Sequence, residues 1–482
     1  MKKWLSILLA LTLAMTAFSA FAEGAGAPPG DPPGEPPEGF DGSNPPGDPP
    51  DGFGGGNPPG DPPGGFGGGT PPGGGASSVT WTAATEINAD SDLKTRISEI
   101  YSSETADENA LLLSQAGITL DDPTVTKTGD SDGGDNCSFY GVNAAVLAKD
   151  GADVVITGGL IESSANGANG VFVYGGNGGR NGADGDGTTL HISDTVITTT
   201  GDGSGGIMTT GGGITYAENL TVTTSGRSSA AIRTDRGGGT VTVDGGTYTT
   251  NGLGSPAIYS TADVTVKNAV LVSNMSEGVC IEGKNSVTLE NCSLTAGNTR
   301  RNGHATFLDS VMIYQSMSGD ADSGTSAFTM TGGSLTSLSG HMFHVTNTHA
   351  VITLSGVNLV NEGSDVLLSV CDDGWSGASN TAELVADAQS LSGAVLVGSN
   401  STLTLTLKNG SVFEGYINGE IRNADGEQVS TEVGTVSVSL DGSSAWVLTA
   451  DTYITEFSGD AANVTANGYT LYVNGTALEG TN

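Results

Sequence analysis

Two arginines and an aspartate lie within four positions of the segment SAAIRTDRGGG, at Arg233, Asp235 and Arg236, and Arg227 lies just before them. The chain has only 16 Lys and Arg among its 482 residues, so this segment holds a large share of its positive charge. Such a cluster could be a catalytic site, a surface that binds the hydroxyl or carboxyl groups of a ligand, or a structural ion-pair network. Which one applies depends on where each side chain points, and therefore on the fold.

A short turn motif recurs along the chain from about residue 110. Segments such as VTVDGGTYT, VTVKNAVLV and VTLENCSLT join a strand of alternating apolar residues to a second short strand, through a turn rich in Gly, Asn or Asp. In nine of ten such segments, an apolar or aromatic residue stands five places after the last apolar residue of the first strand. Those last apolar residues are Leu120, Ile156, Ile192, Val243, Val266, Leu289, Met330, Leu354 and Leu407. In the tenth segment, the polar Thr221 stands five places after Tyr216. Ala386 with Leu391 marks one further turn.

The spacing of these motifs predicts an all-β protein, a right-handed parallel β-helix solenoid. The shortest intervals between motifs are 23 to 27 residues, which is one coil of a solenoid. Short strands rich in Val, Ile and Thr, joined by residues that tolerate left-handed backbone, suit coils that stack about 4.8 Å apart. A β-sandwich is the alternative for such a composition, but it would not repeat one turn motif at this period.

The chain divides into five predicted regions. Residues 1–22 have the basic start, apolar stretch and Ala-Phe-Ala end of a signal peptide, and residues 23–76 form a disordered spacer rich in Pro and Gly. Residues 77–109 are predicted to cap the solenoid, because Leu93, Ile97 and Ile100 stand at helical spacing there. Residues 110–430 form the β-helix, and residues 431–482 form its closing turns.

The composition limits the partners and the location of the protein. A formal charge of −37 strongly disfavours binding to the phosphates of nucleic acid, and leaves neutral glycans, divalent cations and basic surfaces open. After residue 22, no stretch approaches the roughly 18 apolar residues of a transmembrane segment. We therefore expect a secreted protein that is released or held non-covalently at a cell surface.

The repeated VTVxGG and VTLxN turns resemble those of the pectin-lyase-like right-handed β-helix superfamily, as does the closing WVLTADTYIT…NGYTLYVNG segment. The likeness covers residues 110 to 480 and is closest to exported bacterial proteins that are adhesin-like or carbohydrate-binding. It implies the fold without specifying a chemistry. In superfamily members that are lyases, the resemblance implies a basic residue that removes a proton beside a carboxylate held by Ca²⁺. In members that are hydrolases, it implies clustered aspartates.

A second strand of each coil predicts a row of side chains that point away from the core. The apolar alternation places residues such as Ile232 and Ile258 inward, so the next residue of each strand points outward. These outward residues are the predicted ligand-binding residues: Tyr174, Met208, Arg233, Tyr259, Glu282, Tyr314 and His344. Aromatic rings, an arginine and a glutamate in one stripe are typical of a surface that binds a polysaccharide or a cell-surface glycan.

Two other interpretations of this row stay open. The side chains could simply cover the sheet, with Arg233 stacked on Tyr259 as a cation–π contact. A lyase or glycoside hydrolase would need a second acid/base group near Arg233, but Asp235 is the one acid among the next outward positions, and Lys284 lies about two coils away. The sequence therefore favours glycan binding, with no catalytic residues predicted.

Calcium is the one cofactor that the sequence suggests. The insertions GGNGGRNGADGDG and GDADSG each occur once, and Asp184, Asp186, Asp320 and Asp322 in them could supply oxygen ligands to Ca²⁺. Because the GGxGxD repeat of calcium-binding β-helices is absent, plain loops are the alternative interpretation.

Overall fold

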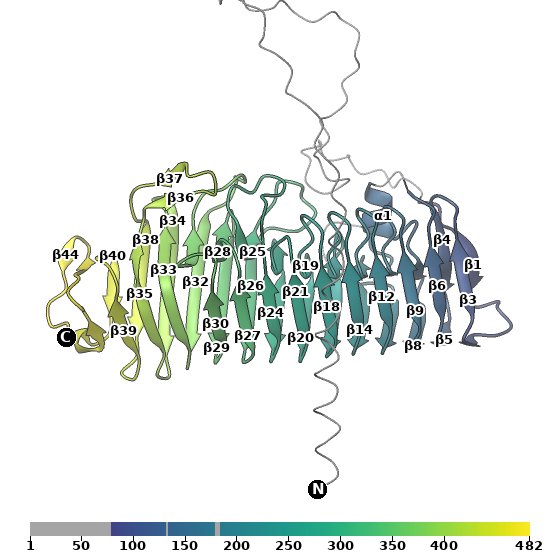
Figure 1. Ribbon diagram of the computed structural model, residues 1–482, viewed down its shortest axis with the longest axis horizontal. Helices are drawn as coiled ribbons and strands as arrows, with labels where there is room; N and C mark the ends of the chain where they lie inside the picture. Colours follow the sequence, from purple (N-terminus) through teal and green to yellow (C-terminus); the bar gives the residue numbers. More distant parts are fainter. Residues whose placement is uncertain (1–78, 132–133, 179–183) are drawn as a thin grey trace, which may run out of the picture. The chain divides into compact units, whose positions relative to one another are not determined.

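The computed structural model describes residues 79–131, 134–178 and 184–482, all of which belong to one compact unit, Asn57–Asn482. The predicted signal peptide and spacer lie outside the described residues. Within the described part, the chain forms a parallel β-helix: it winds through three long sheets, here called A, B and C, in successive coils (Figure 1). The predicted fold class is confirmed, since neighbouring strands in all three sheets pair in parallel.

The strands of the three sheets alternate along the chain. Sheet A comprises β1 (Thr82–Ile87), β4 (Glu108–Ser114), β7 (Val146–Lys149), β10 (Val171–Tyr174), β13 (Ile207–Thr210), β16 (Ile232–Thr234), β19 (Ile258–Ser260), β22 (Val279–Glu282), β25 (Asp309–Tyr314), β28 (His341–Thr346), β31 (Val366–Val370), β33 (Ser390–Val397), β35 (Val412–Asn418), β39 (Ala445–Leu448) and β42 (Val464–Thr465). Sheet B comprises β2 (Thr95–Ile97), β5 (Gly117–Asp121), β8 (Asp153–Thr157), β11 (Thr189–Ser193), β14 (Gly213–Glu218), β17 (Gly239–Asp244), β20 (Asp263–Lys267), β23 (Ser286–Glu290), β26 (Thr325–Thr331), β29 (His349–Ser355), β32 (Asn380–Asp387), β34 (Ser401–Lys408), β38 (Thr435–Leu440) and β41 (Glu456–Ser458). Sheet C comprises β3 (Ile100–Ser103), β6 (Thr124–Lys127), β9 (Leu160–Ser163), β12 (Val196–Thr199), β15 (Thr221–Thr224), β18 (Thr247–Thr250), β21 (Val270–Ser273), β24 (Ser293–Ala296), β27 (Ser334–Ser337) and β30 (Asn358–Asn361).

The turn motif seen in the sequence connects sheet B to sheet C. Leu289 in β23 and Leu294 in β24 are both fully buried, and the corresponding pairs are buried in most other coils. Leu359 is half-buried, and Val412 is 38% exposed because β34 leads directly to β35 of sheet A, where Phe413 is the buried residue. The residue at the corner has a positive φ, for example 53° at Asn219, Asn268 and Asn291, and glycines such as Gly245 and Gly246 take this place in other coils. Asn, Asp and Gly recur here because they tolerate left-handed backbone at low cost.

The tenth motif follows the same rule at a different residue. Ala217, not Tyr216, pairs with Ile192 and points inward, and Val222 is the buried residue five places later. Tyr216 instead stacks on His191 on the outer face of sheet B, with ring centroids 4.8 Å apart. The five-residue rule therefore holds in this coil once Ala217 is taken as the inward residue, whereas after Leu407 the buried residue is Phe413, six places on.

The predicted helical spacing of residues 93–100 is wrong, because these residues form β2 and β3 in the first coil of the solenoid. Leu93, Ile97 and Ile100 are 61%, 65% and 77% exposed, while Tyr101 points inward. Coils therefore begin at Thr82, inside the region predicted as a cap.

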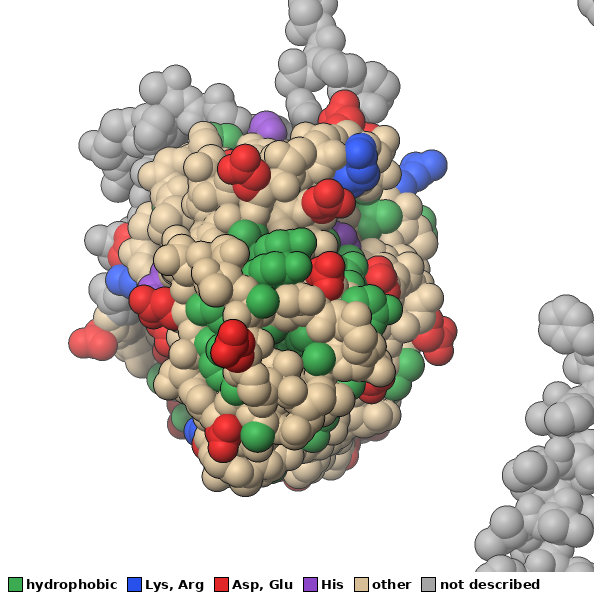
Figure 2. Space-filling model, turned by 90° about the vertical axis from the view of Figure 1, so that its left-hand side faces the viewer, with side chains coloured by type: hydrophobic (Ala, Val, Ile, Leu, Met, Phe, Trp, Pro, Cys, Tyr) green, Lys and Arg blue, Asp and Glu red, His purple; other side chains and the backbone are tan. Residues whose placement is uncertain are grey.

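Short strands close the C-terminal end. The parallel pair β40 (Thr452–Ile454) and β43 (Leu471–Val473) is extended by the antiparallel β44 (Thr476–Ala477). Figure 2 views this end and shows hydrophobic side chains at its surface with acidic side chains among them. Tyr453 is half exposed and stacks on Tyr472, with ring centroids 5.0 Å apart.

Four further elements lie outside the coils. The helix α1 (Asp135–Tyr140) precedes β7, and the antiparallel pair β36 (Ile421–Arg422) and β37 (Gln428–Ser430) follows β35. A short 3-10 helix spans Ala461–Asn463.

Candidate functional site

The predicted outward residues do point away from the core, but they form two rows. Strand pairing aligns Met208, Arg233, Tyr259 and His344 in one row with Phe172, Cys280 and Met312, and puts Tyr174, Glu282 and Tyr314 in the next row, two residues further along. The apolar alternation determines which face a residue occupies. It does not determine the register, because a shift of two residues keeps a side chain on the same face.

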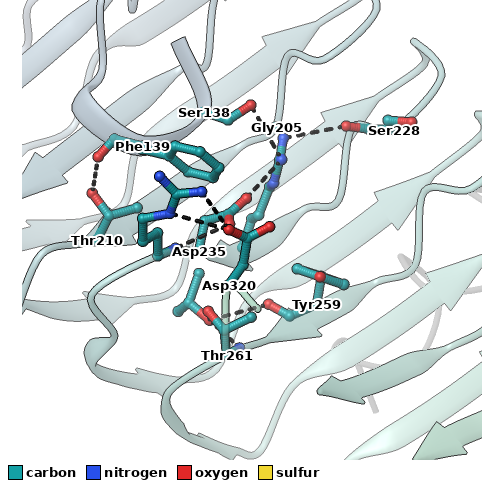
Figure 3. Close-up of polar contacts among 12 residues, drawn as sticks. Ser138, Phe139, Gly205, Thr210, Ser228, Asp235, Tyr259, Thr261 and Asp320 are labelled. Atoms are coloured by element: carbon teal, nitrogen blue, oxygen red, sulfur yellow. Dashed lines mark hydrogen bonds and ion pairs between the residues drawn. The ribbon is translucent and has the colours of Figure 1, made fainter. Parts of the chain in front are cut away.

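The predicted exposed stripe is also absent, because loops and α1 cover this face of sheet A. Six of the seven residues are buried, and Tyr259 is half-buried. Over β13 and β16 the cover is α1, whose Phe139 carbonyl accepts a hydrogen bond from Thr210 at 2.8 Å (Figure 3). No row of exposed rings is therefore available there for a sugar chain.

The arginine cluster is part of this cover. Arg233 pairs with Asp235 at 3.0 Å, and both side chains are only 9% exposed. Arg236 donates to Asp320 at 3.1 Å and 2.6 Å, and its guanidinium lies 3.9 Å from the centre of the Phe139 ring (Figure 3). Burial raises the pKa of Asp235 to about 7, although Arg233 lowers it. The cluster is a buried ion-pair network, and the predicted stacking of Arg233 on Tyr259 is replaced by these contacts.

The aspartates predicted as calcium ligands have other partners. Asp320 pairs with Arg236, Asp322 pairs with Lys284 at 2.7 Å, and Asp186 accepts hydrogen bonds from Thr188. Asp184 is exposed. Across residues 79–131, 134–178 and 184–482, no three or more His, Cys, Asp or Glu side chains are grouped so that they could hold a metal ion. At Asp320 and Asp322, Arg236 and Lys284 occupy carboxylate oxygens that a cation would need.

A small pocket lies on the outer face of sheet A over β19, β22 and β25. Its walls are the rings of Tyr259, Tyr314 and Trp375, together with Met312, Glu277 and Asn302, and its cavity volume is about 40 Å³. The rings of Tyr314 and Trp375 lie 4.9 Å apart at 54°. Two tyrosines of the predicted row thus meet here with residues from the connections that follow β24 and β31.

Glu282 fixes the two tyrosine rings of the pocket. Its Oε2 accepts hydrogen bonds from the hydroxyl of Tyr259 at 2.6 Å and from that of Tyr314 at 3.2 Å, and Ser316 donates to its Oε1. Burial raises the pKa of Glu282, and these hydrogen bonds lower it. Glu282 is therefore a positioning residue for the aromatic walls.

A buried pair of carboxyl groups includes one residue of the pocket wall, Glu277. The amide of Gly278 donates to the carbonyl of Ser310 at 2.8 Å, so Glu277 and Asp309 stand side by side on adjacent coils. Glu277 accepts hydrogen bonds from Ser276 and from Asn298, the latter at 3.1 Å. Asp309 is 1% exposed, and neither of its carboxylate oxygens has a hydrogen-bond partner among the described residues.

The pKa values of this pair follow from its environment. Burial raises the pKa of Asp309 well above its usual range, and the nearby charges of Glu277 and Asp373 raise it further. Burial also raises the pKa of Glu277, against the hydrogen bonds that it accepts. Within the described residues, neither carboxylate has a Lys or Arg partner.

Comparison of the chain with protein-family models, curated proteins and solved structures found no match. The resemblance to the pectin-lyase-like superfamily therefore stays a prediction beyond the fold itself. Among the described residues there is also no helix with the length and apolar character needed to span a membrane.

A serine, two histidines and an aspartate lie close together one coil beyond the pocket. Ser369 Oγ is 2.8 Å from Nδ1 of both His341 and His344, and Nε2 of His344 is 3.3 Å from Asp373. Burial, and then His344, lower the pKa of His341 to about 3, so this ring is neutral. Because Ser369 and His344 are fully buried and one hydroxyl bridges two imidazoles, the geometry is that of a structural network and not of an exposed nucleophile.

Sequence reasoning missed Glu277, Asn302, Asp309 and Trp375. Asp309 begins β25 and Glu277 lies two residues before β22, outside the apolar alternation that marked the outward row. Asn302 and Trp375 belong to connections that carry no repeat. The one available signal was the length of the interval between the motifs at Leu289 and Met330, 41 residues in place of 23 to 27, which indicates an insertion over this coil.

Proposed function

We propose that this protein is an extracellular glycan-binding protein, acting as a cell-surface adhesin or polysaccharide-binding protein, and that the pocket of Tyr259, Tyr314 and Trp375 is its binding site. The observation that carries this proposal is the meeting of three aromatic rings around a pocket with carboxylate and amide oxygens in its wall. Aromatic rings stack on the apolar faces of pyranose rings, and such oxygens accept hydrogen bonds from sugar hydroxyls.

The polar groups of the pocket support a ligand with hydroxyl or amino donors. The Oδ1 atom of Asn302 is buried and has no hydrogen-bond partner among the described residues. A buried acceptor without a donor is costly, and a bound hydroxyl or amine would supply the missing hydrogen bond. The predicted signal peptide at residues 1–22 supports an extracellular location.

The binding experiment is a glycan array followed by calorimetry on the purified protein. For a retained glycan, we expect Trp375→Ala and Tyr259→Ala to weaken binding on the order of tenfold or more, because each removes a stacking wall. Tyr216→Ala is the matched control, since this exposed tyrosine lies on sheet B and should not affect binding. Retention of no glycan, or equal binding by all variants, would refute the proposal.

A polysaccharide lyase or glycoside hydrolase is the second candidate function. Glu277 favours it, because burial raises the pKa of this pocket carboxyl and a second carboxyl, Asp309, stands beside it. A carboxyl with a raised pKa is what a general acid requires. Incubation with polysaccharides, with and without calcium, separates the candidates. New reducing or unsaturated ends would demonstrate cleavage and overturn the binding-only proposal.

A further inference from the structure

We infer that the pocket takes a cationic group, so that the ligand class is a glycan with free amino groups, such as a polymer of unacetylated glucosamine. This inference rests on the proposed function and specifies the ligand of the same site. Three features carry it: the aromatic walls, the buried carboxylates beside them, and the size of the cavity.

The aromatic walls suit a cation. The faces of Trp and Tyr rings attract ammonium groups, more strongly where water is excluded. Trp375 and Tyr314 are almost fully buried, and Tyr259 is half-buried, so the rings are largely shielded from water. Because Glu282 accepts the hydroxyl hydrogen bonds of both tyrosines, the rings are already fixed before a ligand arrives.

The carboxylates suit a donor with positive charge. Glu277 lies in the pocket wall, and Asp309 on the next coil has two oxygens without a partner among the described residues. An ammonium group has three N–H donors and no acceptor, which complements carboxylates that can only accept when ionised. Burial raises the pKa values of both carboxyls in the unliganded protein, and an ammonium group bound beside them would stabilise their ionised forms, which a neutral sugar cannot do.

The basic side chains of this region do not compensate the pair. Arg233, Arg236 and Lys284 are each paired with an aspartate, Asp235, Asp320 and Asp322 respectively. In the 297–308 connection, Arg300 and Arg301 are exposed, and Arg301 pairs with Asp425 at 2.9 Å.

The cavity size favours a primary ammonium. A volume of about 40 Å³ corresponds to roughly three water molecules at ~10–15 Å³ each. An ammonium group is about the size of one water molecule and can enter, with its pyranose ring at the pocket mouth beside Tyr259. The formal charge of −37 also attracts a polycationic glycan from a distance.

The test compares two hexasaccharides by calorimetry at pH 6: glucosamine hexamer and its fully N-acetylated counterpart. We expect the glucosamine hexamer to bind at least about tenfold more tightly, because acetylation removes the charge. Glu277→Gln should weaken that binding on the order of tenfold. Glu414→Gln is the matched control, since it removes the same charge from an exposed position of sheet A on β35 and should change the affinity less than about twofold.

The outcomes separate this inference from the proposed function. Equal or tighter binding of the acetylated hexamer, with loss on Trp375→Ala, would overturn the cationic ligand and leave glycan binding in place. Equal losses of affinity in Glu277→Gln and Glu414→Gln would show that binding depends only on the overall charge of the protein. That result would also overturn the inference. Binding of neither hexamer, together with an empty glycan array, would overturn both proposals. If Glu277→Gln does not fold, Tyr259→Leu provides the second test, with the same expected loss for the glucosamine hexamer.

Discussion

At the scale of single residues, the segments that pack over sheet A determine which outward side chains reach the pocket. Tyr259 and Tyr314 were predicted as ligand-binding residues and do line the pocket, whereas Arg233 and Met208 are covered by α1 and neighbouring loops. Outward direction follows from alternation along a strand, but exposure depends on what packs over the sheet. The loops that supply this cover carry no repeat, so their paths could not be predicted.

Breaking the ion pair of Arg236 and Asp320 should destabilise the protein. Both side chains are largely buried, and removal of Arg236 leaves Asp320 without its partner and Phe139 without its cation. We expect Arg236→Ala to lower the free energy of unfolding by about 2–4 kcal/mol, measured by urea denaturation. Lys267→Ala removes a more exposed pair with Glu290 and should cost at most about 1 kcal/mol, and similar losses in both variants would contradict the argument.

The buried Asp309 should make stability dependent on pH. Its folded-state pKa is raised above the ordinary value of 3.8, so the folded state holds the proton more tightly than the unfolded state does. This contribution to stability is complete below pH 3.8 and is lost progressively as the pH rises toward the folded-state pKa. Relative to Asp309→Asn, the wild-type protein should therefore lose stability as the pH rises above about 4 in urea titrations; parallel pH profiles would contradict this.

At the scale of elements, the corner between sheets B and C was the most predictable feature. Its five-residue spacing identified most of the buried positions on both sides, with Val412 as an exposed exception, and the exception at Tyr216 disappeared once Ala217 was seen to point inward. Helical spacing at Leu93, Ile97 and Ile100 was misleading, because three apolar residues in a short segment also occur on strands at the end of a solenoid. The register of sheet A was not predictable for a related reason: strands of three to six residues are too short to fix an alignment by pattern alone.

Substitution at the corner residue Asn291 should depend on backbone conformation. With φ at 53°, a β-branched residue is strained there, while glycine is not. We expect Asn291→Val to lower the free energy of unfolding by about 1–2 kcal/mol and Asn291→Gly to change it by less than about 0.5 kcal/mol. Thermal unfolding followed by circular dichroism measures both, and equal effects would show that the side chain, not the backbone, matters at this corner.

At the scale of the whole molecule, the described coils form a nearly one-dimensional stack, in which each coil contacts its neighbours. Near the C-terminal end, Trp446 is fully buried, stacks on Phe413 and donates to the carbonyl of Gly415 at 3.1 Å. The solenoid itself was predictable from its period, whereas the pocket depends on long-range contacts between connections that are far apart in the chain. Glu277 and Trp375, for example, are almost one hundred residues apart.

Trp446→Ala should destabilise the C-terminal coils of the stack and leave the stability of the N-terminal coils unchanged. Truncating a buried tryptophan costs about 3–5 kcal/mol at its own coil, and in a stack of this kind the loss stays close to that coil. Hydrogen exchange followed by mass spectrometry should show faster exchange in β35, β39 and β42 and unchanged exchange in β5, β8 and β11. Uniformly faster exchange would mean that the solenoid unfolds as one unit.

The connections that cover sheet A have a consequence for how this architecture can change. The long insertions at 297–308, 315–324 and 371–379 all flank strands of sheet A, while the corners between sheets B and C stay short. The pocket combines strand residues of sheet A with residues from the 297–308 and 371–379 insertions, whereas the stack depends on the inward residues. New specificities can arise by exchange of a single insertion, much as the loops of an antibody vary on a constant framework, while strand register and core packing remain as they are.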